Sequence, residues 1–308
     1  MRLAVLCIVK NEASSLLEWI AWHRVQGVTD FYIVDNYSTD QTWPLLQQLA
    51  VQTDWLHCYR IPTVGSRPPQ MHAYRRLLPL LQKKADVVAM IDADEYLMPM
   101  GEHSMADLCQ QWFADAEVGA VALNWACFGS AGQIFAEEGF VFERFCQRFA
   151  PERLHNLHYK TLFRPGSVDR LVSPHQVKLK QGRIINSAGE PLRDHAKHTK
   201  GLSAALDWRH ARVNHYVVKS LEEFLVRKST VGSAASTTKK KHRTYFDKHN
   251  HNDELDQSAL SYRAAVDTDY RHLQTLVRDV SPNTRSWRLR LQDKYWHLKM
   301  KLDALLGN

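Results

Sequence analysis

The chain has 308 residues, with 40 lysines and arginines, 33 aspartates and glutamates, and 44% hydrophobic residues. This composition excludes a disordered chain, and the length allows one large domain or two modest ones. The net charge of +7 indicates an anionic partner and leaves nucleic acid, nucleotide phosphates and acidic lipids open.

Strand and helix patterns alternate along the first 125 residues. Apolar runs predict strands at 3–9, 31–34, 55–59, 86–91 and 119–125. Helical periodicity and capping signals predict helices at 12–26, 39–52, 68–84 and 105–114. This alternation predicts an α/β fold with a mostly parallel, doubly wound sheet flanked by helices.

Beyond residue 126 the pattern loosens. Scattered glycines predict an irregular region with a few antiparallel strands up to about residue 200, and helices are predicted at 220–229, at 259–278 and from 284. The polar and basic stretch 233–241 reads as a loop. We therefore divide the chain into a catalytic domain at 1–232 and a basic helical C-terminal extension at 233–308.

The segment 285–306 has apolar residues, including Trp287, at helical spacing among basic residues. A basic amphipathic helix of this kind can lie on an anionic membrane surface, or it can pack on the catalytic domain. Both alternatives stay open, and we expect a cytoplasmic protein that contacts the inner face of the membrane if the first holds.

The five cysteines show no CxxC spacing, and their number is odd. A disulfide framework and a zinc ribbon are therefore not expected, and reduced, mostly buried thiols are. The apolar N-terminal run meets Lys10-Asn11-Glu12 at once, without a small-residue cleavage site, which favours a buried strand over a signal peptide. No apolar run approaches the roughly 20 residues that cross a membrane.

An acidic turn, Asp92-Ala93-Asp94-Glu95, follows the fourth predicted strand. Carboxylates one residue apart can turn toward one hard cation, such as Mg²⁺ or Mn²⁺, that keeps positions open for substrate phosphates. A solvated acidic turn is the alternative for a DxD motif on its own. The loops 10–12 and 35–40 also follow strands, and ligands of such sheets bind at the carboxyl ends of strands, so the three loops should converge on one crevice.

The order and spacing of a longer set of residues carry a resemblance to a known family. The set comprises 9–12, Glu18, Trp19, His23, Gly27, 34–40, Gln70, 91–97, Trp125, 128–130, Lys160, Pro174, His175, 214–216, Lys219, Ser220, Glu223 and Phe224. It resembles the nucleotide-sugar-dependent glycosyltransferases of the GT-A fold, in the family 2 group and, more closely, the family 92-like transferases. The resemblance covers about residues 3–232 and implies a GT-A (Rossmann-like) domain.

The resemblance also implies a nucleotide-sugar donor, with a UDP-sugar as the first expectation, and Mn²⁺ or Mg²⁺ as cofactor. Asp92 and Asp94 would hold the cation against the donor diphosphate, with Asp94 as the direct ligand. Asp92 would contact ribose or bind through water. His175 is the candidate third ligand, although lone histidines are more often structural.

The nucleotide-sugar pocket is expected to draw on several loops. Asp35 matches the family acid that hydrogen-bonds the uracil or ribose, but Asn36 stands where a second acid is usual. The other expected contacts are Lys10, Asn11, Glu12, Gln70, Asp92, His215 and Lys219. Helix capping, a surface helix and a hydrogen-bonded corner are the structural alternatives for these residues.

Trp125, Phe128 and Gly129 form an aromatic segment that ends in a glycine turn. Sugar rings stack their C–H faces on aromatic side chains, so the segment is the candidate acceptor-binding platform, with core packing as the alternative.

The catalytic base is chosen from several carboxylates, because the usual family 2 Glu-Asp pair is missing after Asp94. An inverting transferase needs such a group to take the acceptor proton. Glu143 is our candidate because it follows the aromatic segment; the others are Glu137, Glu138, Asp169 and Asp194.

Three functions are weighed. The first is a metal-dependent glycosyltransferase that moves a sugar to a hydroxyl of a glycan or glycolipid, with inversion implied by the family. A Mg²⁺-dependent nucleotidyltransferase is second, although a glycine-rich phosphate loop is missing after the first strand. A nucleic-acid-binding module is third, and it is disfavoured because the basic residues are dispersed and the crevice loops are acidic.

Overall fold

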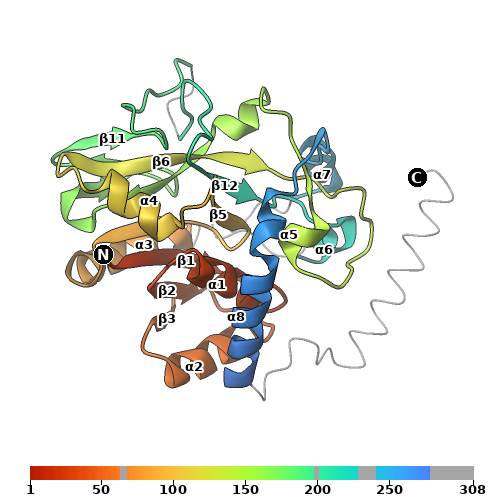
Figure 1. The fold of residues 1–308 in the computed structure, drawn as a ribbon. Helices are drawn as coiled ribbons and strands as arrows, with labels where there is room; N and C mark the ends of the chain where they lie inside the picture. Colours follow the sequence, from red (N-terminus) through yellow and green to blue (C-terminus); the bar gives the residue numbers. More distant parts are fainter. Residues whose placement is uncertain (63–67, 198–200, 228–240, 278–308) are drawn as a thin grey trace.

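The computed structural model describes residues 1–62, 68–197, 201–227 and 241–277. Its main sheet has the strand order β3-β2-β1-β4-β8-β6-β12-β5, and β11 pairs with β6 (Figure 1). Two further pairs, β9 with β10 and β7 with β13, lie outside this sheet. This is the mixed α/β architecture with a Rossmann-like half that the resemblance to GT-A enzymes implied.

The N-terminal half of the sheet is parallel throughout. Its strands are β1 (Leu3–Val9), β2 (Asp30–Asp35), β3 (Leu56–Arg60) and β4 (Val87–Met90). The connecting helices are α1 (Leu16–Val25), α2 (Thr42–Gln52) and α3 (Pro69–Lys84). All seven elements agree with the sequence prediction to within a few residues at each end.

The second half of the sheet is mixed. β8 is antiparallel to β4 and β6, whereas β12 is parallel to β6 and antiparallel to β5. These strands are β5 (Glu95–Pro99), β6 (Val118–Cys127), β8 (Tyr159–Phe163), β11 (Arg183–Ile185) and β12 (Ala211–His215). β5 was not predicted, because it begins inside the acidic turn and its residues show no separate boundary.

The remaining elements are short, apart from α8. The helices are α4 (Met105–Trp112), α5 (Val141–Arg144), α6 (Leu221–Arg227), α7 (Arg243–Lys248) and α8 (Arg263–Leu276). The strands are β7 (Gln147–Arg148), β9 (Val168–Leu171), β10 (Val177–Leu179) and β13 (Glu254–Leu255).

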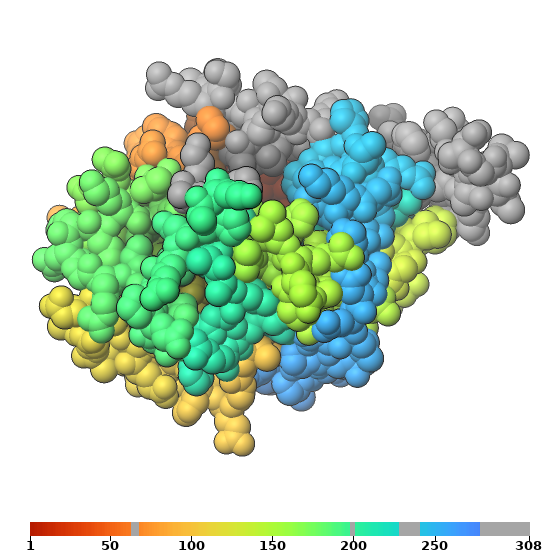
Figure 2. Space-filling model, turned by 90° about the horizontal axis from the view of Figure 1, so that it is seen from above, coloured from red at the N-terminus to blue at the C-terminus, as the bar shows by residue number. Residues whose placement is uncertain are grey.

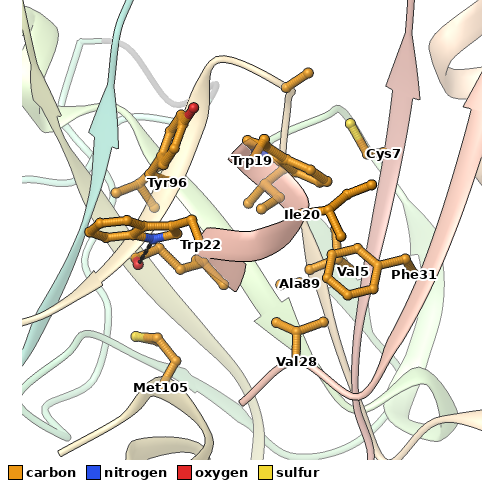
Figure 3. Close-up of a cluster of buried hydrophobic side chains, with 14 of the residues drawn as sticks. Val5, Cys7, Trp19, Ile20, Trp22, Val28, Phe31, Ala89, Tyr96 and Met105 are labelled. Carbon is orange, nitrogen blue, oxygen red and sulfur yellow. Dashed lines mark hydrogen bonds between the residues drawn. The ribbon is translucent and has the colours of Figure 1, made fainter. Parts of the chain in front are cut away.

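Helix α1 is locked to β5 by two buried tryptophans. The indole N–H of Trp19 donates to the Glu95 carbonyl oxygen at 2.8 Å, and that of Trp22 to the Leu97 carbonyl oxygen at 2.8 Å. Figure 3 shows both rings beside Tyr96 in the core. The residues that flank the acidic turn are thereby fixed on the helix side.

The described part of the C-terminal extension, residues 241–277, packs into the same core as the rest. Helix α8 lies along α1 (Figure 1), with Val266 and Leu273 in the main cluster and an Arg24–Asp269 ion pair of 2.9 Å. β13 pairs with β7, and Figure 2 shows this segment in blue beside the yellow-green residues near 150. The boundary we drew at residue 232 therefore crosses one continuous core. The predicted helix from 284 and the amphipathic segment 285–306 lie outside the described residues.

All five cysteines are free thiols, and three of them are buried, which confirms the prediction. In the parts of the chain that the structure describes, we find no helix long and apolar enough to cross a membrane.

Candidate active site

The acidic turn between β4 and β5 is fixed from both sides. Its own backbone closes a turn, since the Glu95 N–H donates to the Asp92 carbonyl oxygen at 3.0 Å. The N–H of Tyr216, just beyond β12, donates to the Asp94 carbonyl oxygen at 2.9 Å. The turn therefore depends on β12 as well as on the strand that precedes it.

Asp92 is held by two side chains from opposite halves of the sheet. Gln70 Nε2 donates to its Oδ1 at 2.6 Å, and Lys160 Nζ donates to its Oδ2 at 2.7 Å. Burial disfavours both charges, but their mutual attraction outweighs it and holds the pKa of Asp92 below, and that of Lys160 above, its ordinary value. Both carboxylate oxygens of Asp92 are thus engaged, and Lys160 is fully buried.

Glu95 also stabilises this turn, through its side chain. Its Oε2 accepts the Asp92 backbone N–H at 2.8 Å and lies 3.1 Å from Lys160 Nζ. Its Oε1 is buried without a hydrogen-bond partner. Burial raises the pKa of Glu95 to about 8 despite the nearby lysine. We assign it a structural role in the turn.

Asp94 lies beside an imidazole from β12. Its Oδ1 is 3.7 Å from His215 Nε2, and its side chain is 16% exposed. Within the described residues, no group of three or more His, Cys, Asp or Glu side chains is placed to hold a metal ion. The predicted set of Asp92, Asp94 and His175 is therefore not assembled as a metal centre made by the protein alone.

The donor atoms at Asp94 still suit a hard cation. Mg²⁺ and Mn²⁺ are commonly held by one or two carboxylates together with substrate phosphates and water. Asp94 supplies a carboxylate and His215 an imidazole nitrogen at the carboxyl end of β4 and β12. One carboxylate and one imidazole would hold such a cation weakly, and a substrate diphosphate would complete its ligands.

Three imidazoles surround Trp125. The ring centroids of His158, His175 and His215 lie 4.9, 5.2 and 4.3 Å from that of the indole. The half-buried indole is thus packed among side chains, and its Nε1 is buried without a hydrogen-bond partner. The prediction of Trp125 as an open stacking platform for a sugar is not supported by this packing.

His175 is oriented by the strand next to it. Its Nδ1 lies 3.0 Å from the Tyr159 carbonyl oxygen, which can only accept, so Nδ1 carries the proton. Burial lowers the pKa of His175 to about 3, which keeps the ring neutral. Gly201, at φ +76°, allows this position, because a Cβ there would lie 2.7 Å from the His175 Cβ.

Phe128 and Gly129 belong to the core rather than to an acceptor surface. The Phe128 ring is buried, and its centroid lies 4.9 Å from that of the Tyr216 ring. A Cβ at Gly129 would lie 2.4 Å from the His251 carbonyl oxygen and from Asn252 Oδ1. The aromatic-glycine pattern therefore reflects close packing of the 250–252 segment, which favours the core-packing alternative for both residues.

The first two polar loops are joined to each other, as predicted. The Asn11 N–H donates to Ser38 Oγ at 2.9 Å, while its side-chain oxygen accepts the Thr39 N–H at 2.8 Å. The Glu12 N–H donates to Thr42 Oγ1 at 2.8 Å. Lys10 is half-buried where β1 ends. These contacts bring the loops after β1 and β2 to one edge of the sheet.

Asp35 holds an arginine that the sequence reading missed. Its carboxylate accepts the Ser38 N–H and pairs with Arg60 Nε at 2.9 Å. The Arg60 guanidinium lies 4.4 Å from the Tyr37 ring centroid and 5.1 Å from that of Trp43. Because Tyr37 is 50% exposed, its ring is the open aromatic surface of this loop, whereas the Asp35 carboxylate is buried.

Lys219 is buried in a charge network instead of lying on the surface of the pocket. Its Nζ donates to Ser15 Oγ at 3.3 Å, and burial together with Arg227 lowers its pKa to about 8. Glu12 forms an ion pair with Arg227. Lys219, predicted to contact the phosphate, thus contacts Ser15 just before α1. Glu12, predicted to contact the nucleotide, contacts Arg227 of α6.

Glu143 lies on the side of α8. Its carboxylate accepts the Phe140 backbone N–H at 3.1 Å and forms an ion pair with Arg263. These contacts cap the short helix α5 and join it to α8. They bring Glu143 toward neither Asp92 nor Asp94, and the identity of the base stays a prediction.

Three functional candidates escaped the sequence assignment of roles: Arg60, Lys160 and Tyr37. Lys160 was part of the resemblance but carried no role, because a lysine inside a strand gives no sign of its partner. Arg60 ends β3, and the strand-end rule that selected the other loops could have found it.

The family model of Glycosyltransferase family 92 matches residues 4–258. The chain is 25% identical over 193 residues to a glycosyltransferase family 92 protein of Oryza sativa subsp. japonica, covering 62% of this chain and 32% of the relative. It is 26% identical over 188 residues to another of Ricinus communis, covering 57% and 31%. The chain thus spans about a third of the length of these curated relatives.

Two solved structures are similar over parts of the chain. S. aureus TarS 1–349 in complex with UDP is 14% identical, with a TM-score of 0.36, over 54% of this chain and 47% of that one. The mannosyltransferase PcManGT from Pyrobaculum calidifontis, in complex with GDP-Man and Mn²⁺, is 25% identical, with a TM-score of 0.30, over 40% and 35%.

Proposed function

Since the chain belongs to glycosyltransferase family 92, we propose that it transfers a sugar from a nucleotide-diphosphate sugar to a hydroxyl group of a glycan or glycolipid. The proposal is carried by one observation, the opposite surroundings of the two carboxylates after β4. Asp92 is neutralised by Lys160 and held by Gln70, whereas Asp94 lies beside His215.

This asymmetry divides the work between the two carboxylates. Asp92 has both oxygens engaged, so we propose that it orients the turn and meets the donor through a hydrogen bond to ribose or water. Asp94 is the direct ligand for Mn²⁺ or Mg²⁺, with His215 beside it. A bound cation supplies charge stabilisation to the departing diphosphate.

The reaction is a displacement at the anomeric carbon. The acceptor oxygen forms a bond to that carbon as the bond to the donor phosphate oxygen breaks, and the electron pair stays on the diphosphate. The acceptor proton passes to a base. We propose a single displacement with inversion, in which preorganised charges at the strand ends stabilise the leaving group.

The joined loops 10–12 and 35–40 are proposed to bind the nucleoside. Their mutual hydrogen bonds fix the backbone before the donor arrives, which lowers the entropy lost on binding. The exposed ring of Tyr37, backed by Arg60, offers a stacking face for the base. A UDP-sugar stays our first donor candidate, and GDP-sugars are the first alternative.

Thermal unfolding with nucleotides tests the proposal. A panel of UDP, GDP, their sugars and the matching monophosphates is added with and without Mn²⁺. A ligand at 100 times its Kd adds about 2.7 kcal/mol to the free energy of unfolding, which shifts the Tm by several degrees. We expect at least one nucleoside diphosphate to stabilise the protein, and to do so more strongly with Mn²⁺.

Variants at the turn give the matched control. Asp94→Ala should abolish the part of the Tm shift that depends on Mn²⁺, while Lys178→Ala, on the exposed β9–β10 hairpin, should leave it unchanged. Release of pyrophosphate from a nucleoside triphosphate and a sugar phosphate would instead support a nucleotidyltransferase. No stabilisation by any nucleotide would contradict both.

A further inference from the structure

Helix α7 packs beside the residues that follow β12. Its Phe246 packs in a small apolar cluster with Val217 and Val218. These two valines follow Tyr216, whose N–H holds the Asp94 carbonyl oxygen. The segment that begins at residue 241 therefore packs on Val217 and Val218, next to the residue that contacts the acidic turn.

Lys241 stands two residues before α7 and is held by an aromatic side chain. Its Nζ donates to Tyr245 Oη at 3.1 Å and lies 4.2 Å from the centroid of the Tyr245 ring. Tyr245 in turn stacks on His249 with a centroid distance of 3.8 Å. A cation held on a ring keeps donors available for a further anionic partner.

The carboxylates of the acidic turn act electrostatically on Lys241. Burial lowers the pKa of Lys241, and the carboxylates of Asp94 and Asp92 act against that effect. The ammonium group is thus partly desolvated and within electrostatic range of both carboxylates. A partly desolvated charge interacts more strongly with an anion than one in open solvent.

Three other basic side chains near this end of the sheet have their partners inside the protein. Lys160 contacts Asp92 and Glu95, Lys219 contacts Ser15, and Arg227 pairs with Glu12. Each neutralises a carboxylate or joins a buried network of the fold. Lys241 instead is held by an aromatic side chain, Tyr245.

We propose that Lys241 binds the diphosphate of the donor and stabilises its charge as the sugar departs. This inference rests on the proposed function and extends the site beyond residue 232, where the sequence reading placed its end. Tyr245 is the positioning residue, because its ring and hydroxyl hold the ammonium group.

The test compares Lys241→Gln with Lys248→Gln, which removes an exposed lysine from α7. Calorimetric titration measures the binding of UDP and GDP, and electron paramagnetic resonance measures the binding of Mn²⁺ to the nucleotide-free protein. We expect Lys241→Gln to weaken diphosphate binding about tenfold, as for the loss of one charge-assisted hydrogen bond. Binding of the nucleoside monophosphate should change less.

The affinity for Mn²⁺ should change in the opposite direction to the affinity for the diphosphate. Removal of a cation near Asp94 and Asp92 lowers repulsion, so Lys241→Gln should bind Mn²⁺ more tightly than wild type. A merely structural role for Lys241 would weaken both ligands together. Tyr245→Phe, which keeps the ring and removes the hydroxyl, should give a smaller loss of diphosphate affinity than Lys241→Gln.

The outcomes separate the two proposals. If wild type binds neither UDP nor GDP, the proposed donor class fails together with this inference. If wild type binds one of them, and Lys241→Gln binds it as tightly as Lys248→Gln does, the inference alone is overturned. Equal weakening of diphosphate and Mn²⁺ binding by Lys241→Gln would also overturn it.

Discussion

The two halves of the sheet contribute opposite chemistry to the candidate site. The parallel half brings the acids, on loops that follow β1, β2 and β4. The mixed half brings lysines and imidazoles, on β8, β12 and the segments that follow them. The acidic site residues of the first half are Glu12, Asp35, Asp92 and Asp94, beside the basic Lys10 and Arg60, and the second half supplies Lys160, His175, His215, Lys219 and Lys241.

The difference explains how a strongly acidic edge remains stable in a folded protein. Unpaired buried carboxylates are costly. Arg60 of the same half pairs with Asp35, whereas Lys160 and Arg227 of the second half pair with Asp92 and Glu12. Asp94, at the boundary, is where the proposed cation and donor complete the balance. Variants that break this division should therefore differ in whether they lower activity or stability.

The largest expected effect is on catalysis, from Asp94→Asn. The amide keeps the shape of the side chain but removes the charge that holds the proposed cation. We expect sugar transfer to fall about a thousandfold, comparable to the loss of a strong electrostatic contact in a transition state. Transfer assays with saturating Mn²⁺ measure this, and a rate within tenfold of wild type would contradict the role of Asp94.

Lys160→Met should instead act mainly on stability. It leaves Asp92 without its cation beside a buried Glu95, and because the Asp92 side chain is 34% exposed, the loss should stay below the roughly 3–5 kcal/mol typical of breaking a fully buried pair. Urea unfolding measures the loss. In a double mutant with Asp92→Asn the loss should be smaller than the sum of the two single losses. Additive losses would show that the pair is not coupled.

Glu223→Gln should produce a loss of stability that depends on pH. The contact with Arg144 outweighs burial and lowers the pKa of Glu223 to about 2, and the partners lie 2.9 Å apart with 10% and 19% of their side chains exposed. A lowered pKa stabilises the folded protein at pH values above the unfolded pKa of 4.5. This stabilisation is lost as the pH falls toward 2. The difference corresponds to about 3 kcal/mol.

Unfolding at pH 7 and pH 3 checks this prediction. The wild type should exceed Glu223→Gln by about 3 kcal/mol at pH 7 and by less than half of that at pH 3. A difference that does not change with pH would place the effect in packing and not in the ion pair.

Tyr37→Ala tests the parallel half by itself. The ring is half exposed and stacks on Arg60, so its removal should change stability by less than about 0.5 kcal/mol. Nucleotide affinity should fall about tenfold if the base stacks there, since base–aromatic stacking is worth roughly 1–3 kcal/mol. Tyr37→Phe should bind as wild type does.

Glu143→Gln should have the smallest effect. Its carboxylate is engaged with Phe140 and Arg263, so we expect transfer to stay within a few-fold of wild type and stability to fall by about 1 kcal/mol. A loss of transfer above a hundredfold would restore Glu143 as the catalytic base.

The sequence predicted the parallel half well because its rules are local. Apolar runs, helix periodicity and the position of ligands at strand ends were sufficient to find β1–β4, their helices and the three polar loops. The pairing of Asp92 with Lys160 joins residues 68 positions apart, and no local pattern encodes it. The burial of Phe128 could not be predicted, because an aromatic side chain at the end of a strand looks the same whether it faces a crevice or the core.

The pairing of β5 has a consequence for the order in which the site forms during synthesis. Among the strands that the structure describes, β5 hydrogen-bonds only to β12 within the sheet, in the register Glu95 to His215. A nascent chain that has emerged to the end of β6 already holds the residues of every acidic loop, but lacks the strand that seats the turn after β4. The loops proposed to bind the nucleotide are therefore made early, and the proposed centre closes only when the ribosome has passed β12.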